Sequence, residues 1–309
     1  MLNLKFKISK TIVVTFALMQ NKSISLLAWL LFISLALIWG SSFILIKKGL
    51  VGLSAIQVGS LRIFIAFLCF TPFYAKGLRE VSKSKYGYVL LSGMTGNLIP
   101  AFLFAIAQTK IQSSVTGVLN SLVPIFILII SVFVFKEKFK RIQIIGLIIG
   151  FVGAFILIAF KSTNFQIDLN LYTLLIVGAV ICYAISANVI KYKLVELKPM
   201  HVSSLALLPV GPIAGFVFIY SGGINAALSS DIGMNSFLYV SFLGLMASTV
   251  ALVMFNKLLQ ISPIIFASSV TYVIPIIAIT WGLFDGEILG VNQLIGIGII
   301  LAGVFLIKK

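Results

Sequence analysis

The chain has 309 residues, of which 61% are apolar and 10% are charged, and its mean hydropathy is +1.19. A soluble globular protein is about one quarter charged, so this composition excludes an ordinary soluble fold. The net charge of +16 does not indicate a nucleic-acid-binding protein, because the basic residues form short clusters between long apolar runs rather than one basic face. Composition and charge pattern together predict an integral membrane protein.

Residues 1–22 are predicted to form a cytoplasmic or interfacial tail. The apolar stretch from Thr11 to Met19 is only nine residues long, which is too short to span a bilayer. Polar residues follow it directly, so the small-residue cleavage site of a signal peptide is missing. A second interpretation is that translation begins at Met19, and the sequence leaves both open.

Ten later segments have the length and the apolar character of membrane-spanning helices, which need about 20 residues each. They lie near residues 27–46, 55–75, 86–107, 113–135, 142–160, 170–190, 201–220, 235–256, 263–284 and 291–307. Helices are expected because an isolated strand in lipid cannot pair its backbone polar groups. The sequence therefore predicts an all-α integral membrane fold with ten transmembrane helices.

The basic residues test this number of spans and give an orientation. With ten spans, eighteen of the 23 Lys and Arg residues fall on the side of the N-terminus, four fall on the other side, and Arg62 lies inside a span. Cytoplasmic loops collect Lys and Arg. Both termini are therefore predicted to be cytoplasmic, in the cell membrane.

An internal repeat links the two halves of the chain. The segment from Ser113 to Ile158 resembles the segment from Ala267 to Ile307, and the Glu-to-Gly intervals are 9 and 16 residues in both copies. The matched residues are Pro124 with Pro275, Glu137 with Glu287, Gly146 with Gly296, and Gly153 with Gly303. A weaker similarity links the segments that begin at Trp39 and Tyr183.

Five helices per repeat is an odd number, so the second copy must enter the membrane from the opposite side. The predicted units are residues 23–161 and 162–309, related as inverted repeats, with Glu137 cytoplasmic and Glu287 external. Many secondary transporters have this architecture, with a substrate site near mid-membrane where the halves meet. The alternative is that the repeat records only gene duplication.

The sequence also resembles the ten-helix EamA branch of the drug/metabolite transporter superfamily, over nearly its whole length. The resemblance rests on WGSSF from Trp39, on Arg62 near the start of the second span, and on the duplicated Pro-to-Glu segment followed by a glycine-rich helix. It implies two five-helix halves around a central cavity lined by the first, third and fourth helices of each half. It also implies export of amino acids or other metabolites, without naming the solute. The one departure is Asp285-Gly286 before Glu287, which puts only that helix end in doubt.

Polar and aromatic side chains within the spans are the candidates for substrate contact, because polar groups in hydrocarbon are expected to face a cavity or another helix. The predicted substrate-binding residues are Trp39, Asn97, Asn120, Tyr183 and Tyr272. For each of them, hydrogen bonding between helices is the competing interpretation. For Arg62, anion binding is one interpretation, and a structural partner such as a backbone carbonyl is the favoured one.

Prolines and glycines suggest where helices bend and where they pack. Pro100, Pro124 and Pro275 each remove a backbone donor inside a span, which makes them hinge or kink candidates. Close helix packing, with dimerisation as the alternative, is predicted for Gly146, Gly150 and Gly153 in one helix and Gly296, Gly298 and Gly303 in another.

Motifs for catalysis or direct energy coupling are not found in the sequence. There is no GxxxxGK[ST] phosphate loop and no clustered set of metal ligands, so no cofactor and no metal are predicted. The favoured function is a secondary transporter of small metabolites, as a monomer or homodimer in the lipid bilayer. A flippase for lipids or lipid-linked sugars on the same fold, and less favoured an integral membrane enzyme, are the alternatives.

Overall fold

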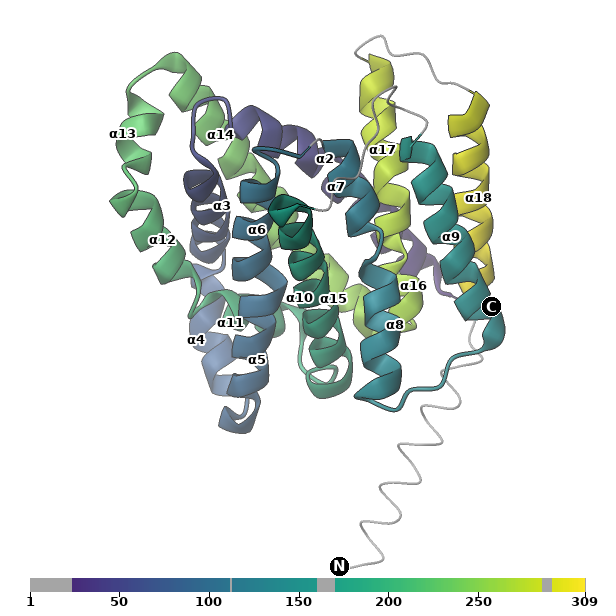
Figure 1. Cartoon of the computed structure of the whole chain (residues 1–309). Helices are drawn as coiled ribbons and strands as arrows, with labels where there is room; N and C mark the ends of the chain where they lie inside the picture. Colours follow the sequence, from purple (N-terminus) through teal and green to yellow (C-terminus); the bar gives the residue numbers. More distant parts are fainter. Residues whose placement is uncertain (1–23, 112, 160–169, 285–290, 309) are drawn as a thin grey trace, which may run out of the picture.

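The computed structural model describes residues 24–111, 113–159, 170–284 and 291–308, and every regular element in these ranges is helical (Figure 1). The first half of the chain contains α2 (Leu26–Gly49), α3 (Ala55–Cys69), α4 (Thr71–Glu80), the 3-10 helix η1 (Lys83–Lys85), α5 (Tyr86–Gly93), the π-helix η2 (Met94–Leu98), α6 (Ile99–Ala107), α7 (Ser113–Asn120), α8 (Val123–Phe133) and α9 (Arg141–Ala159). The second half contains α10 (Leu171–Lys193), α11 (Pro199–Leu207), α12 (Gly211–Tyr220), α13 (Gly223–Leu228), α14 (Asp231–Leu245), the π-helix η3 (Met246–Val250), α15 (Ala251–Ile261), α16 (Ile264–Ser268), α17 (Val270–Phe284) and α18 (Val291–Lys308). The predicted all-helical fold is confirmed, whereas the predicted tail and Glu287 lie outside the described residues.

Six helical stretches are long and apolar enough to cross a membrane, and a seventh is the bent pair of α3 and α4. The remaining predicted spans correspond to shorter apolar helices at Arg141–Leu157, Ile264–Ile277 and Leu294–Lys308. Each of the ten predicted segments overlaps one of these helices, while six or seven satisfy the criterion of length. The total of ten spans therefore stays a prediction.

The second predicted span is sharply bent rather than straight. The axes of α3 and α4 differ by 68° across Phe70. Pro72 lies in the first turn of α4, where its missing N–H leaves no helical hydrogen bond unmade. The proline therefore starts a second helix at the bend.

The start of α3 is fixed by a capping box and is connected to the other half. The Ser54 hydroxyl accepts the Gln57 backbone N–H at 3.3 Å, and the Gln57 side chain accepts the Ser54 N–H at 2.9 Å. The Gln57 side-chain amide also donates to the Ser221 carbonyl, just after α12, at 2.8 Å. One glutamine thus sets where α3 begins and anchors α12 to it.

The outer surface of the protein carries many large apolar side chains. Phe133, Phe216 and Leu228 are between 66% and 70% exposed, although each belongs to a regular helix. Such a surface would be a liability in water but matches a hydrocarbon environment, where backbone groups are paired inside helices. The surface therefore agrees with embedding in a bilayer.

The helices of the two halves pack crosswise (Figure 1). α2 contacts α14, α15 and α17, whereas α10 contacts α5, α6, η2, α7 and α8. The first long helix of each half thus lies against the third and fourth spans of the other half. Like elements also pair, because α3 packs on α12, α4 on α11, and α9 along α18.

The α9–α18 pair shows how closely two helices approach through glycine. Gly146 lies against the Gly303 carbonyl, whereas Gly153, further along α9, lies against the Gly296 carbonyl. Residue numbers rise in one helix and fall in the other, so the two helices are antiparallel. The glycines predicted to pack helices face one another here, except that Gly298 is exposed and a Cβ added to it would have no neighbour within 4 Å. Its inclusion in the packing face was wrong, because it points away from α9.

Substituting Gly303 should destabilise the protein. A Cβ at this position would lie 2.5 Å from the backbone nitrogen of Gly150, and backbone atoms cannot move aside as a flexible side chain can. We expect Gly303→Ala to lower the free energy of unfolding by about 1–3 kcal/mol, as measured by denaturant titration in detergent micelles. Gly298→Ala is the matched control on the same helix and should leave stability unchanged or raise it. Equal losses in both variants would contradict this packing.

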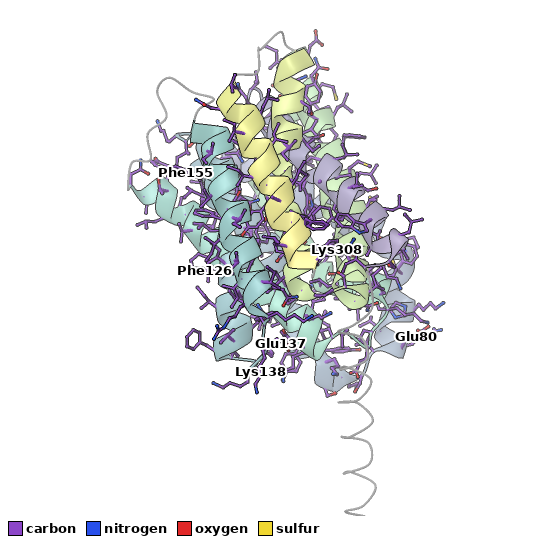
Figure 2. All side chains as sticks on the ribbon, turned by 90° about the vertical axis from the view of Figure 1, so that its right-hand side faces the viewer. Glu80, Phe126, Glu137, Lys138, Phe155 and Lys308 are labelled. Carbon is purple, nitrogen blue, oxygen red and sulfur yellow. The ribbon has the colours of Figure 1, made fainter. Side chains whose placement is uncertain are left out.

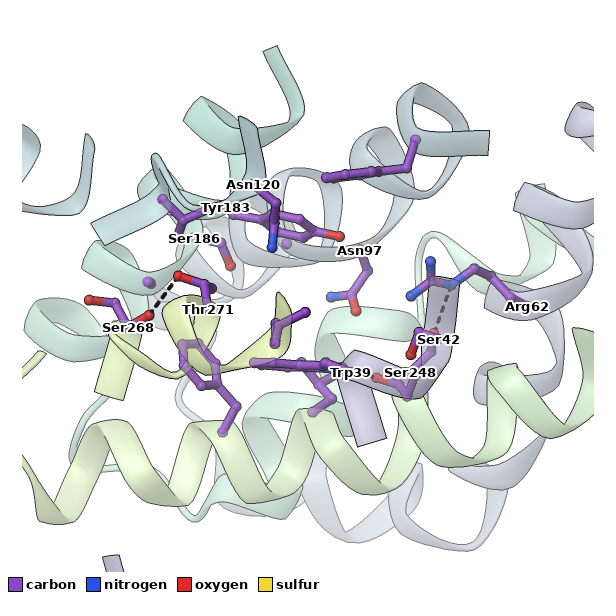
Figure 3. A pocket seen from close by; sticks show the side chains of 18 of the residues that line it. Trp39, Ser42, Arg62, Asn97, Asn120, Tyr183, Ser186, Ser248, Ser268 and Thr271 are labelled. Atoms are coloured by element: carbon purple, nitrogen blue, oxygen red, sulfur yellow. Dashed lines mark hydrogen bonds between the residues drawn. The ribbon is translucent and has the colours of Figure 1, made fainter. Parts of the chain in front are cut away.

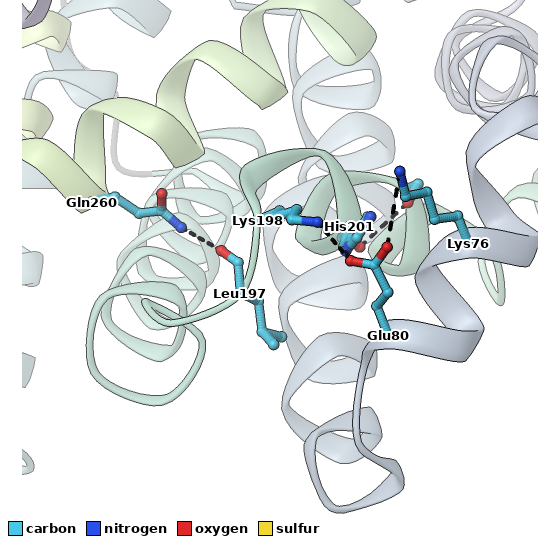
Figure 4. A network of polar contacts seen from close by, with 7 residues as sticks. Lys76, Glu80, Leu197, Lys198, His201 and Gln260 are labelled. Atoms are coloured by element: carbon cyan, nitrogen blue, oxygen red, sulfur yellow. Dashed lines mark hydrogen bonds and ion pairs between the residues drawn. The ribbon is translucent and has the colours of Figure 1, made fainter.

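Polar contacts join the two halves at one end of the molecule (Figures 2 and 4). Figure 2 places Glu80, Glu137 and Lys138 toward this end and Phe155 toward the other. Glu80, which ends α4, accepts a hydrogen bond from Lys198 at 2.7 Å.

Three further contacts strengthen this connection. His201 and Lys76 lie 3.6 and 3.9 Å from the Glu80 carboxylate. Lys85 pairs with Glu196 at 2.6 Å. Apart from the pair with Lys76 on the same helix, these contacts connect α4 and η1 of the first half with the start of α11 and the segment before it in the second half.

The stabilising effect of Glu80 should depend on pH. The hydrogen bond from Lys198, followed by the charges around it, lowers the pKa of the Glu80 carboxyl. A carboxylate of lowered pKa stabilises the fold above its unfolded-state pKa and loses this effect as pH falls through the folded-state value. We expect Glu80→Gln to lower the Tm slightly at neutral pH, because the site is exposed, and the difference to shrink below about pH 4.

Two lysine variants control for this effect. Lys198→Gln removes the 2.7 Å partner and should resemble Glu80→Gln, whereas Lys76→Gln removes the 3.9 Å partner and should have the smaller effect. A Tm difference between wild type and Glu80→Gln that stays constant down to pH 3 would contradict the assignment.

Candidate functional site

The crosswise packing encloses a cavity of about 140 Å³. A single water needs about 10–15 Å³, so there is room for several waters or a small organic solute. Side chains from α2, α3, η2, α6, α7, α8, α10, η3, α15, α16 and α17 line it. The lining is mostly apolar with a few polar groups, which is the usual composition of a small-molecule site. The polar and indole-bearing residues of the lining are Trp39, Ser42, Arg62, Asn97, Asn120, Tyr183, Ser186, Ser248, Ser268 and Thr271 (Figure 3).

Two aromatic pairs form facing walls of the cavity. Trp39 of α2 meets Phe255 of α15 edge-on, with ring centroids 5.2 Å apart. Tyr183 of α10 stacks on Phe104 of α6 at 5.8 Å. In each pair, an aromatic residue from the first helix of one half contacts a phenylalanine from the third span of the other half. The weak sequence similarity between the Trp39 and Tyr183 segments thus corresponds to a structural equivalence.

Both third spans contain a π-helix where they face the cavity. The carbonyls of Met94 and Met246 accept from the N–H groups of Ile99 and Ala251, five residues later rather than four. A π-helix widens the turn, and such insertions often occur at functional sites. In this protein they bring two residues each to the lining, Gly96 with Asn97 and Ala247 with Ser248.

The Trp39 indole is held against the second π-helix. Its Nε1–H donates to the Ala247 carbonyl at 3.3 Å, a group that the widened turn makes accessible. The Ser186 hydroxyl of α10 similarly donates to the Ser92 carbonyl, just before the first π-helix, at 3.2 Å. In each half, a side chain of the first helix therefore donates a hydrogen bond to a backbone carbonyl in or near the π-helix of the other half.

Two helix breaks supply further polar groups. Asn120 ends α7 directly before the turn into α8, and Ser268 ends α16 before Thr271 of α17. The Thr271 hydroxyl donates to the Ser268 carbonyl at 3.1 Å. In the part of the chain that the structure describes, the side-chain amides of Asn97 and Asn120 make no hydrogen bond, so both remain free for a ligand.

The three predicted hinge prolines occupy different positions along their helices. Pro100 lies in the first turn of α6, directly after the π-helix, and Pro124 in the first turn of α8. Pro124 follows the turn at Ser121 and Leu122, where the missing N–H is tolerated because first-turn donors have no helical partner. Pro100 lies where the π-helical bonding of η2 returns to α-helical bonding, within a helical stretch that continues from Lys83 to Ala107. Pro275 lies inside α17. Pro124 thus marks a helix break, whereas Pro100 and Pro275 lie inside continuous helical stretches.

Arg62 has a structural partner, which is the favoured interpretation of the sequence, and it also lines the cavity. The partner is a hydroxyl rather than a backbone carbonyl: the Arg62 Nε–H donates to the hydroxyl of Ser248, from the second π-helix, at 3.0 Å (Figure 3). The sequence could not show this, because residues 62 and 248 are brought together only by the packing of α3 on α14 and η3.

Four of the five predicted substrate residues lie together in the cavity. Trp39, Asn97, Asn120 and Tyr183 line it, whereas Tyr272 does not. Tyr272 is fully buried against Gly150 of α9, and its hydroxyl has no hydrogen-bond partner in the described part of the chain. The neighbouring Thr271 faces the cavity instead, because adjacent residues on a helix point about 100° apart. The role of all five in binding stays a prediction.

The Trp39 hydrogen bond should contribute measurably to stability. Trp39→Phe keeps an aromatic ring beside Phe255 but leaves the Ala247 carbonyl without this donor, so we expect a loss of about 0.5–1.5 kcal/mol in the free energy of unfolding. Trp29→Phe removes the same atoms from a tryptophan whose described contacts are the rings of Phe32 and Phe266 and the Lys308 ammonium group, and it serves as the control. Equal unfolding free energies for the two variants would contradict a role for the hydrogen bond.

Comparisons with known proteins agree with this architecture. A crystal structure of another protein superposes with a TM-score of 0.70, covering 90% of this chain and 95% of that chain at 14% identity, which establishes similarity of fold. An uncharacterized transporter of Archaeoglobus fulgidus is 24% identical over 283 residues, covering 91% of this chain and 98% of the relative. An uncharacterized transporter of Clostridium kluyveri is 25% identical, covering 85% and 86% of the two chains.

The sequence is also similar to a named bacterial transporter, and it matches the model of a transporter family. The uncharacterized inner membrane transporter YedA of Escherichia coli K12 is 24% identical, covering 89% of this chain and 88% of the relative. The model of the EamA-like transporter family matches two segments, residues 26–159 and 170–308. With its apolar helices, this chain therefore belongs to the EamA-like transporter family and is a multi-pass transporter of the cell membrane.

Proposed function

We propose that this protein is a secondary transporter that exports a small organic solute through the central cavity. The observation that carries the proposal is the composition of the cavity walls, to which each half contributes one ring of both aromatic pairs and one π-helix. A site shared by two bodies changes shape when those bodies move relative to each other. That coupling is what alternating access requires.

The proposed mechanism treats residues 23–161 and 162–309 as inverted repeats. Three observations support this proposal: the crosswise packing of α2 and α10, the antiparallel contact of α9 with α18, and the two matches of the family model. Rocking of the halves would separate the contacts of Glu80 and Lys85 with the second half at one end and open the cavity there. The π-helix beside Pro100 and the helix break before Pro124 would serve as hinges.

Amino acids are the first solutes to test, on the strength of the resemblance that the sequence shows. The cavity offers free amides at Asn97 and Asn120 for polar groups and aromatic faces at Trp39 and Tyr183 for apolar ones. In the described part of the chain, no carboxylate lines the cavity. A simple cation would therefore find no counter-charge, and the proposal favours neutral, zwitterionic or mixed solutes.

Filling the cavity should abolish transport. We expect purified protein in liposomes to carry at least one solute from a panel of amino acids, sugars and nucleosides, and Asn120→Trp to reduce that flux at least tenfold by occupying the cavity. Asn225→Trp, at an exposed position of α13, is the matched control and should retain wild-type flux. Monodisperse elution in size-exclusion chromatography verifies that both variants fold.

The outcomes of the transport assay separate this function from its alternatives. Absence of protein-dependent flux for the whole panel, with and without a proton gradient, would contradict solute transport. Scrambling of labelled lipids without solute flux would indicate the flippase instead. Equal inhibition by both tryptophan variants would show that the cavity is not the route.

Inversion of the halves predicts opposite exposure of equivalent positions. In a variant whose two native cysteines are replaced, single cysteines beside Glu137 and Glu287 should react with a membrane-impermeant thiol reagent from opposite sides of the membrane. Labelling is measured in intact cells and in inverted vesicles. Reaction from the same side would rule out inverted repeats.

A further inference from the structure

Among the described residues that line the cavity, Arg62 alone carries a charged side chain. The remaining polar groups of the lining are hydroxyls, amides and one indole. Figure 3 shows Arg62 at the same end of the cavity as Ser42, Asn97 and Ser248, whereas Ser268 and Thr271 lie at the opposite end. The cavity therefore has one positively charged end and one uncharged polar end.

The protein fixes the position of the guanidinium but does not use all of its donors. Only Nε is engaged in the described part of the chain, through its 3.0 Å hydrogen bond to Ser248. The helix carrying Arg62 is held tightly, because a Cβ on Gly244 would lie 2.8 Å from the Arg62 carbonyl oxygen. The terminal amino groups of the guanidinium are thus left for another partner, at a defined place in the cavity wall (Figure 3).

A cation within a membrane span and without an anionic partner is costly, and charged side chains within spans normally pair or mark the path of a substrate. The acidic residues that the structure describes, Glu80, Glu137, Glu196 and Asp231, all lie outside the lining. The protein positions the charge without neutralising it. An anionic group on the solute would complete the pair.

We propose, building on the proposed function, that Arg62 binds a carboxylate of the transported solute and that Ser248 orients the guanidinium for this contact. A guanidinium presents two parallel N–H donors that match the two oxygens of a carboxylate. One positive charge balances one carboxylate, whereas a phosphate monoester carries nearly two negative charges at neutral pH. The site therefore selects monocarboxylates over phosphorylated solutes.

The rest of the solute would lie between the aromatic pairs. Trp39 and Tyr183 offer faces for an apolar chain, and an ammonium group could interact with the same faces through cation–π attraction. Ser268 and Thr271 would meet a polar group at the far end. Zwitterionic amino acids and simple monocarboxylates both fit this description, and both retain the carboxylate.

The test compares solutes of similar shape that carry a carboxylate, lack it, or carry a phosphate in its place. Leucine and 4-methylpentanoate keep the carboxylate, leucinamide and isoamylamine lack it, and a phosphate monoester of similar size replaces it. Flux of each is measured in proteoliposomes containing wild-type, Arg62→Gln, Arg62→Lys or Arg79→Gln protein. Arg79 is exposed on α4 outside the cavity and controls for loss of an arginine. We expect the two carboxylates to be carried at least tenfold faster than the other solutes.

The variants separate recognition from structure. Arg62→Gln should lower carboxylate flux by about 10- to 100-fold. The flux of Arg62→Lys should lie between that of wild type and that of Arg62→Gln, and the flux of Arg79→Gln should match wild type. Size-exclusion elution and the Tm of each variant exclude misfolding as the cause. If leucinamide or isoamylamine is transported at the same rate as leucine, and Arg62→Gln does not change these rates, the inference is overturned. Transport itself would still be established.

A binding measurement keeps the two proposals distinguishable if no flux is found. The thermal unfolding midpoint of the detergent-solubilised protein is measured with each solute. A rise in midpoint with leucine or 4-methylpentanoate, absent with leucinamide and lost in Arg62→Gln but not in Arg79→Gln, supports carboxylate binding even where transport fails. Absence of both flux and carboxylate-specific stabilisation overturns both proposals.

Discussion

Backbone groups in a hydrocarbon environment must be paired within the protein, and this requirement shapes the cavity more than any single side chain does. Four departures from regular α-helical bonding, at η2 and η3 and at the breaks before α8 and α17, border the cavity. Side chains satisfy the disturbed backbone: Trp39 donates to the Ala247 carbonyl, and Ser186 to the Ser92 carbonyl. At these places irregular backbone forms part of the cavity wall, as is common at functional sites.

The crosswise arrangement makes these contacts depend on both halves. An indole from α2 pairs with the π-helix of the second half, and a hydroxyl from α10 pairs with the backbone beside the π-helix of the first. The aromatic pairs follow the same rule. Each wall of the cavity is therefore an interface, and any relative movement of the halves changes the polar and aromatic surface that a solute meets.

Charge is distributed unevenly between the rim and the centre. At one end, Glu80 and Lys198 connect the halves through an exposed ion pair, which is individually weak and can separate at little cost. In the centre, Arg62 stands without an acidic partner among the lining residues and is held in place by Ser248. In the proposed transport cycle, the weak contacts of Glu80 lie at the end of the molecule that would open. The charge of Arg62 lies in the cavity where a solute would bind.

The sequence by itself indicated where the apolar helices lie, because hydropathy is a local property. It also identified Trp39, Asn97, Asn120 and Tyr183 as polar or aromatic groups within apolar segments, all of which line the cavity. Which side chains point into the cavity and which point toward other helices was decided only by the tertiary structure.

Tyr272 is turned toward Gly150 and Thr271 toward the cavity, Gly298 points away from α9, and Arg62 meets a hydroxyl from a span 186 residues distant. The lengths of the spans follow from composition, but nearly uniform apolarity around each helix leaves no stripe in the sequence to show which face turns inward. That choice depends on which helices pack together, through glycine contacts and hydrogen bonds between segments far apart in the chain.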